Sequence, residues 1–392
     1  HLKAPALIFT ETDNTNPFLL NLHINDVGHT AVVGPTGSGK SVFLAMLYTQ
    51  FMKYEKARVF IFDKGASSKV ATYANGGIFY DLGIDNISFQ PFKGLGKLND
   101  KILSEEEEEK EKIRRNIELE WAFDWILDIF SAENKVLTPS QKEKVWEALE
   151  LVSNSPIEYR TLTTFSTFLA DPELKEALSP YLITGPLGKY FDSNNEELQN
   201  SNWNVFEMNQ ILNNKKALAP LLMYLFHKIE IQLNGDPTLI IVDESWAMFD
   251  TPIFATKLRE WVKVFRRKNT SIVFATQELG DILNSPLFTA INDACKTKIF
   301  LANPNAKTET YIETYKKFGL NEEEIDLIAN ATEKKDYFIK TSTGFARKFS
   351  LALGKNTLKL VASSRAEELA KADEIKRHTN SPDEFTTEFL KI

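Results

Sequence analysis

One eight-residue stretch has the residue types and spacing of a phosphate-binding loop, G-x-x-x-x-G-K-[ST]. Glycines let such a loop curl its backbone N–H groups around phosphate oxygens, and the start of the following helix adds partial positive charge. We expect Lys40 to reach the β- and γ-phosphates of a nucleotide and the Ser41 hydroxyl to ligate Mg²⁺. The predicted nucleotide-binding residues are Gly34, Pro35, Thr36, Gly37, Ser38, Gly39, Lys40, Ser41 and Val42.

A pair of adjacent acids, Asp243 and Glu244, ends the apolar run over residues 238–242. In a phosphate-loop enzyme the first acid lies beside Mg²⁺, and we expect Asp243 to do so. The second acid points at the γ-phosphate, where Glu244 can orient or deprotonate the attacking water. The alternative is that the pair only caps the next helix. A water-activating glutamate favours a hydrolase over a small-molecule kinase, because a kinase needs a site for its acceptor instead.

Two more polar residues end predicted strands, at the edge where open α/β sheets bind ligands. Gln277 follows the apolar run 271–275 and either hydrogen-bonds the attacking water and the γ-phosphate or is a turn residue. Asp63 ends the run 58–62 and either contributes to the Mg²⁺ shell or caps the following turn. The sequence leaves these alternatives open.

The helix predicted between the last two strands has two different faces. Its apolar residues are spaced i, i+3, i+4, i+7, which predicts a buried side. The cations on the other side are Arg259, Lys263, Arg266 and Arg267. Three interpretations remain: an arginine finger that reaches a neighbouring subunit's γ-phosphate, the lining of a charged channel, or a solvated basic face. Arg266 and Arg267 are the finger candidates.

The elements that must position these residues alternate between short apolar strands and helical stretches, which predicts an α/β fold with a mostly parallel sheet. Residues 336–341 and 345–353 are expected to form a terminal hairpin. Residues 97–200 are charged and helix-prone, so we predict an all-helical insertion there. The predicted domains are the nucleotide-binding domain over 1–96 and 201–362, the insertion over 97–200, and a C-terminal helical tail over 363–392.

Two further segments have roles that the sequence leaves open. The tail begins with a polar helix of weak packing potential, and it is expected to be a partner-binding or disordered end. Residues 184–192 are rich in turn formers where the insertion rejoins the sheet, which allows a hinge but favours a simple loop.

The composition limits what the chain can do. Its 392 residues suffice for one large α/β domain with an inserted or appended unit. One cysteine excludes an internal disulfide, and the five histidines lack metal-ligand spacing. The formal net charge of −8 argues against coating nucleic acid through the overall field, although a local basic stripe can still contact it. No apolar stretch is long enough to cross a bilayer. The single cysteine is typical of a cytosolic protein, which we expect here.

Five stretches together resemble the C-terminal ATPase domain of the VirB/TrbE/CagE family, the motor ATPases of type IV secretion and conjugation machines. They are residues 34–41 (GPTGSGKS), 62–65 (FDKG), 185–192 (GPLGKYFD), 241–246 (IVDESW), and 266–268 (RRK) leading to 275–277 (ATQ). Only the first stretch is common to all phosphate-loop proteins, so the combination is specific.

The resemblance implies a RecA-like phosphate-loop fold with a helical insert, and ATP and Mg²⁺ as cofactors. It implies a homo-oligomer, a hexamer or smaller, at the cytoplasmic side of the inner membrane. It also implies that other secretion-system subunits are its partners there. Because the sequence starts with His1 rather than Met, we expect a processed or truncated chain. The resemblance implies that this chain lacks the family's N-terminal domain, through which such proteins contact the channel and membrane.

The resemblance also assigns roles within the site. Lys40 and Ser41 bind the nucleotide, and Gln277 senses its hydrolysis. Ser41 and Asp243 are the metal ligands, Glu244 handles the water, and Arg266 or Arg267 acts across the subunit boundary.

Three functions remain open. The leading hypothesis is a motor that couples ATP turnover to substrate transfer or to assembly of a channel or pilus. The second is a DNA-translocating ATPase of the HerA/FtsK or coupling-protein kind, which shares the loop, the acid pair and the glutamine. The third is a switch or scaffold that binds ATP with slow turnover, and Glu244 argues against it. Whether the substrate is DNA or protein stays open.

Overall fold

The computed structural model describes residues 4–13, 15–83, 87–97, 104–244, 252–277 and 288–392. Within them the contacts divide the chain into two compact units. The sheet unit comprises His1–Gly83, Ser201–Leu212 and Gln232–Ile392, and the helical unit comprises Ile84–Asn200 and Asn213–Ile231. The boundaries at 97 and 200 therefore stay a prediction, and the contacts also assign residues 213–231 to the helical unit.

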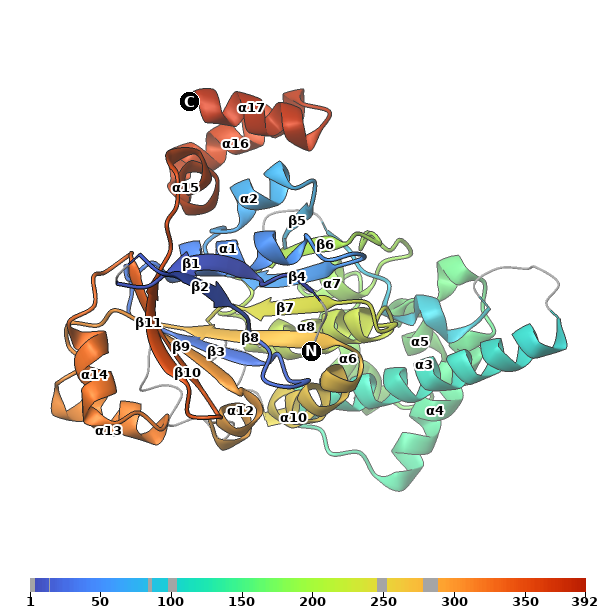
Figure 1. The fold of residues 1–392 in the computed structure, drawn as a ribbon. Coiled ribbons are helices and arrows are strands. Elements are labelled where there is room, and N and C mark those ends of the chain that lie inside the picture. Colours follow the sequence, from blue (N-terminus) through green and yellow to red (C-terminus); the bar gives the residue numbers. More distant parts are fainter. Residues whose placement is uncertain (1–3, 14, 84–86, 98–103, 245–251, 278–287) are drawn as a thin grey trace. The chain divides into compact units, whose positions relative to one another are not determined.

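One 11-stranded sheet forms the centre of the sheet unit (Figure 1). Its order is β2-β1-β11-β10-β9-β3-β8-β7-β4-β6-β5. The strands are β1 (Ile8–Glu11), β2 (Pro17–Leu20), β3 (Thr30–Val33), β4 (Arg58–Asp63), β5 (Ile78–Asp81), β6 (Trp203–Glu207), β7 (Thr238–Val242), β8 (Thr270–Thr276), β9 (Thr297–Leu301), β10 (Asp336–Thr341) and β11 (Ala346–Ser350). The run from β9 to β5 is parallel, and β10, β11, β1 and β2 extend it antiparallel. The predicted mostly parallel sheet is confirmed.

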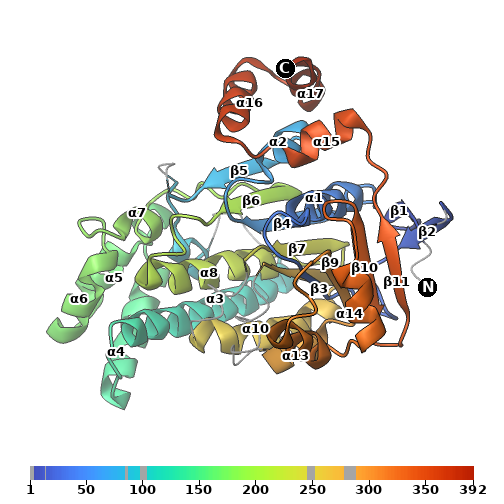
Figure 2. The ribbon, with the colours of Figure 1, turned by 90° about the vertical axis from the view of Figure 1, so that its left-hand side faces the viewer.

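Helices cover both faces of this sheet (Figure 2). The helices of the sheet unit are α1 (Lys40–Phe51), α2 (Lys69–Ala74), α10 (Pro252–Arg267), α12 (Phe288–Ala294), α13 (Glu309–Lys317), α14 (Glu322–Ala329), α15 (Lys355–Ala362), α16 (Ala366–His378) and α17 (Pro382–Lys391). α1 and α2 lie on one face, and α10 lies on the other. The main core lies between α1 and the sheet, where Phe43 and Leu47 pack against Ile61, Ile241 and other buried strand residues. Burying this apolar surface fixes the start of α1 above the sheet.

The C-terminal helices are packed in the sheet unit, contrary to the expectation of weak packing. Val70 of α2, Ala372 of α16, and Phe385 and Phe389 of α17 form a small buried cluster. Asp373 of α16 also accepts hydrogen bonds from Lys69 and Tyr73 of α2, both at 2.9 Å. The expectation went wrong because it stopped at the polar helix 363–376, whereas the aromatic residues that anchor the segment follow it.

The helical unit contains the helices predicted for the insertion, together with α8 from outside the predicted insertion. They are α3 (Glu105–Ala132), α4 (Pro139–Ser153), α5 (Leu162–Phe168), α6 (Pro172–Leu178), α7 (Gly188–Phe191) and α8 (Lys215–Glu230), with short 3₁₀ turns η1 (Pro91–Leu95), η2 (Ile157–Tyr159) and η3 (Ser179–Tyr181). Pro220 lies inside α8 and has no N–H to bond the carbonyl of Lys216. The Tyr181 hydroxyl donates to that carbonyl at 3.3 Å, and Trp125 donates to the Pro220 carbonyl at 2.9 Å. These bonds join α8 to the insertion, which explains why the contacts place it there.

The segment 184–192 is anchored at its end. The Asp192 carboxylate is buried and accepts from the backbone N–H and hydroxyl of Thr163 at 2.9 and 2.5 Å, and from the Ile183 N–H at 2.6 Å. These bonds hold the segment within the helical unit.

Among the described helices, none is both long and apolar enough to cross a membrane.

Candidate nucleotide-binding site

The predicted phosphate loop connects β3 to α1. Gly37 and Gly39 have positive φ angles, 83° and 100°, in the left-handed region that favours glycine. A side-chain carbon at Gly39 would also lie 3.0 Å from the Lys334 Cα atom, so the loop leaves no room for one. Two hydrogen bonds fix the loop. The Gly34 N–H donates to the Thr276 carbonyl at 3.1 Å, and the Ser38 hydroxyl donates to the Pro35 carbonyl at 2.6 Å.

The structure brings Lys40 together with both predicted acids. The Lys40 ammonium donates to Asp243 Oδ1 and to Glu244 Oε1, each at 2.5 Å. All three side chains are buried. They meet because β3 and β7 run parallel with only β8 between them, so their carboxyl ends share one edge of the sheet. This edge is where open α/β sheets bind ligands.

The electrostatics of this group are unbalanced, with one cation between two anions. Burial, together with the neighbouring charges of Asp63 and Glu244, raises the pKa of Asp243 to about 6, although Lys40 acts in the opposite direction. Glu244 has a φ of 51°, and left-handed backbone costs a residue other than glycine about 1–2 kcal/mol. Strain of this kind at a strand end, with the carboxylate turned to Lys40, is a feature of functional sites.

Gln277 lies directly after β8 and contacts the phosphate loop. The Thr36 hydroxyl donates a hydrogen bond to the Gln277 side-chain oxygen. The strand order explains this contact, because β8 is the immediate neighbour of β3. Ser245 and Trp246 of the sequence resemblance lie outside the described residues.

Asp63 caps the turn after β4. Its carboxylate accepts from the Ser67 hydroxyl at 2.9 Å, and from the Ser68 N–H and hydroxyl at 2.8 and 2.6 Å. Glu207, at the end of β6, holds the same turn through the N–H groups of Gly65 and Ala66. Burial and the charge of Asp63 raise the pKa of Glu207 to about 7. Of the two interpretations of Asp63, the geometry favours the cap.

The two candidate finger arginines end α10 and are exposed. Arg266 pairs with Asp26, with Nη2 and Nε at 2.7 and 3.0 Å from one carboxylate oxygen. Among the described residues that line the phosphate pocket, neither Arg266 nor Arg267 is found. In the described part of the chain, the two arginines therefore lie outside the pocket that Lys40 lines.

His29 fixes α10 against the sheet. Its Nδ1 accepts from the Ile272 N–H of β8 at 3.1 Å, so Nε2 carries the proton and donates to the Val262 carbonyl of α10 at 2.9 Å. Burial lowers the pKa of His29 to about 4, which keeps the ring neutral at physiological pH. The sequence does not predict this role of His29, because a single histidine before a strand belongs to no recognisable motif.

A pocket of about 540 Å³ opens above the phosphate loop. Seven of the nine predicted nucleotide-binding residues line it. The other two, Gly34 and Ser38, form the hydrogen bonds that fix the loop. One wall of the pocket is apolar and comes from the segment that follows β11 and from α15. The apolar residues of this wall are Leu351, Leu353, Leu358, Val361 and Ala362. The sequence predicts no base-binding residues, because the i, i+3 spacing of Leu358 and Val361 indicates an apolar helix face but not what that face covers.

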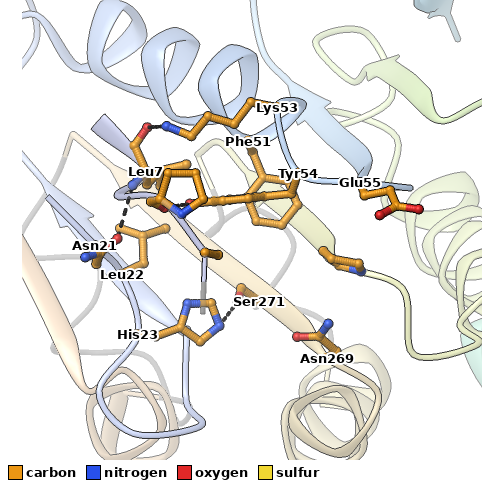
Figure 3. A pocket seen from close by; sticks show the side chains of 13 residues that line it. Leu7, Asn21, Leu22, His23, Phe51, Lys53, Tyr54, Glu55, Asn269 and Ser271 are labelled. Carbon is orange, nitrogen blue, oxygen red and sulfur yellow. Dashed lines mark hydrogen bonds between the residues drawn. The ribbon is translucent and has the colours of Figure 1, made fainter. Parts of the chain in front are cut away.

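A second pocket, of about 340 Å³, lies where β7 and β8 begin, at the edge opposite the phosphate loop (Figure 3). Figure 3 shows His23 pointing at Ser271, with Nε2 3.3 Å from Oγ, and Lys53 reaching the chain near Leu7. Asn21 accepts from the Leu7 N–H at 3.1 Å. These polar groups bond one another, so we do not place a nucleotide there.

Comparison with known proteins agrees with this geometry. The family model described as the TraG P-loop domain matches residues 157–370, and the central domain of the helicase HerA matches residues 13–65. The chain is 36% identical to a probable conjugal transfer protein TrbE of Sinorhizobium fredii, over 93% of this chain and 53% of that protein. It is 30% identical to the type IV secretion system protein virB4 of Bartonella henselae, over 86% of this chain and 41% of that protein. The chain thus spans about half the length of these curated relatives or less.

A solved structure of VirB4 of Thermoanaerobacter pseudethanolicus has the same fold. The two superpose with a TM-score of 0.68 at 16% identity, over 91% of this chain and 99% of that one. The predicted α/β phosphate-loop fold is confirmed. The chain belongs to the TraG P-loop domain family, and the resemblance to the TrbE and VirB4 proteins that its motifs indicate is confirmed.

Proposed function

We propose that this chain hydrolyses ATP as the motor domain of a type IV secretion or conjugation system, and that turnover drives substrate transfer or assembly of a channel or pilus. The single observation that carries the proposal is the bonding of Lys40 to Asp243 and Glu244 at the end of a phosphate loop. The TrbE and virB4 names of the relatives supply the type of machine.

The site residues have separate tasks in this proposal. The loop N–H groups and Lys40 hold the phosphate chain. When Lys40 turns to the β- and γ-phosphates, it releases the two carboxylates it holds in this structure. Glu244 then accepts a hydrogen bond from the attacking water and draws off its proton, and Gln277 orients the same water.

The donor set of the pocket fits Mg²⁺. Ser41 lines the pocket, and Asp243 lies against Lys40, which lines it too. Their hydroxyl and carboxylate are the hard oxygen ligands that Mg²⁺ takes beside substrate phosphates. A Mg²⁺ ion held by Ser41 and Asp243 would supply positive charge against the developing charge of the phosphates. The apolar wall formed by Leu351, Leu353 and α15 has the chemistry to hold the adenine ring.

The proposed context is an oligomer of this chain with other secretion-system subunits, at the cytoplasmic side of the inner membrane. The exposed position of Arg266 and Arg267 supports a role across a subunit boundary, because neither is among the described residues that line the pocket of its own chain. A finger arginine of this kind stabilises charge on the γ-phosphate of the neighbouring site.

Replacing the loop lysine is the first test of function. Lys40→Ala should weaken ATP binding by about tenfold or more and abolish hydrolysis, because a charge-assisted bond to phosphate is lost. Nucleotide affinity by calorimetry and phosphate release would be measured beside the exposed control Lys317→Ala. Wild-type turnover in the Lys40 variant would rule out the proposal.

The second test separates binding from chemistry. Glu244→Gln should keep ATP affinity but lower the turnover number by about a hundredfold or more, because an amide cannot take the water's proton. ATP trapped on the protein after rapid gel filtration would report the stalled state. The matched control is Glu323→Gln, an exposed acid in the first turn of α14. Unchanged turnover would remove Glu244 from the mechanism.

The arginines are tested through their dependence on assembly. Arg266→Ala or Arg267→Ala should leave nucleotide affinity of the isolated chain intact and lower the turnover of the oligomer by about 10³-fold at the finger position. Arg259→Ala, earlier on the same helix, should have little effect. Unchanged rates in both single variants and in the double variant would show that these cations form only a basic surface.

DNA translocation is the second candidate, favoured by the match of residues 13–65 to the HerA central domain. The net charge of −8 argues against strong nucleic-acid binding, so duplex DNA should change the ATPase rate less than about twofold at physiological salt. The rate would be measured with and without DNA at two salt concentrations. Stimulation of tenfold or more that disappears at high salt would instead support the DNA motor.

A further inference from the structure

Tyr337 of β10 has a buried hydroxyl group without a function in the fold. Its ring packs on Phe43 of α1 and Phe349 of β11, with centroids 4.9 and 5.5 Å away. Within the described part of the chain, its hydroxyl oxygen has no hydrogen-bond partner. A buried hydroxyl of this kind destabilises a protein, and phenylalanine would fill the same space without that cost. The hydroxyl therefore calls for another explanation.

The oxygen of Tyr337 lies beside the phosphate loop. A side-chain carbon at Gly39 would be 3.4 Å from it, and Gly39 directly precedes Lys40. Tyr337 lines the same pocket as Lys40 and Ser41, and so does Lys334. The fold thus places a hydroxyl donor at the turn where the phosphate chain of a nucleotide would bind.

The segment that carries Tyr337 is joined to the loop. The Lys334 N–H donates to the Ser38 carbonyl at 3.0 Å, and Lys334 has a φ of 62°, in the left-handed region. This bond fixes the start of β10 relative to the loop. Burial raises the pKa of Tyr337, so its hydroxyl keeps its proton and remains a donor at neutral pH.

We propose that the Tyr337 hydroxyl donates a hydrogen bond to the α- or β-phosphate of the bound nucleotide. This inference rests on the proposed ATP-binding function and adds a donor from β10 to those of the loop. A donor at this position would hold ATP and ADP alike, because both carry these phosphates.

The test replaces only the hydroxyl group. Tyr337→Phe should weaken binding of ADP and of a non-hydrolysable ATP analogue by about tenfold each, as expected for a hydrogen bond to a charged group. Without nucleotide, the melting temperature of Tyr337→Phe should stay unchanged or rise, because an unpaired buried group is removed. A structural role would instead lower the melting temperature and leave affinity unchanged.

A matched control is available in Tyr315 of α13. Tyr315 is also fully buried, but its hydroxyl accepts a hydrogen bond from the Asn303 side chain at 3.0 Å. Tyr315→Phe should therefore lower the melting temperature and leave both affinities unchanged. Of the two variants, only Tyr337→Phe should lose nucleotide affinity, and only Tyr315→Phe should lower the melting temperature.

Two results would overturn the inference. One is an unchanged affinity of Tyr337→Phe for both nucleotides, and the other is a loss confined to the ATP analogue, which would place the contact at the γ-phosphate. Either result, with Lys40→Ala still defective in binding, would leave the proposed function standing. If the wild-type chain bound neither nucleotide, the function and this inference would fail together.

Discussion

The buried contact of one lysine with two carboxylates is the constraint on which the site depends. Lys40 lies between Asp243 and Glu244 with little water around it, so the group carries one positive and two negative charges in a poorly solvated place. Removing one partner of a buried ion pair costs about 3–5 kcal/mol, because the remaining charge is left uncompensated. A triphosphate brings further negative charge, so binding requires that cations be redistributed. Lys40 and a divalent ion held by Ser41 and Asp243 meet that requirement.

The sheet positions the residues that form this contact. The phosphate loop follows β3, the acid pair follows β7, and Gln277 follows β8, which lies between those two strands. The core between α1 and the sheet fixes the helix start that carries Lys40, while His29 ties α10 to β8. The apolar wall comes from the far end of the chain, where α15 lies over α1 and α2 (Figure 2). One edge of one sheet thus gathers residues separated by more than two hundred positions in the sequence.

The sequence predicted the parts of the site that have local patterns. The phosphate loop is a contiguous motif, and the acid pair ends an apolar run, so both could be assigned before their contact was known. The apolar wall was missed because its leucines and valine are ordinary core residues until α15 is placed over the loop. Tyr337 was missed for the same reason, since only the three-dimensional structure reveals that its hydroxyl has no partner and lies beside Gly39.

Two expectations about organisation show a related limit. The polar composition of α16 predicted a weakly packed tail, yet Phe385 and Phe389 in the next helix bury it against α2. α8 was expected in the nucleotide-binding domain, but the bond from Trp125 to Pro220 joins it to the helical unit. Both depend on partners distant in sequence, which periodicity within one element cannot identify.

Lys40, Asp243 and Glu244 are expected to act together on a single bound triphosphate. A structure of the chain with Mg²⁺ and a non-hydrolysable ATP analogue tests it most directly. We predict that the Lys40 ammonium hydrogen-bonds β- or γ-phosphate oxygens and that both carboxylates face the same phosphate group. A triphosphate bound away from the loop, with Lys40 still bridging Asp243 and Glu244, would contradict it.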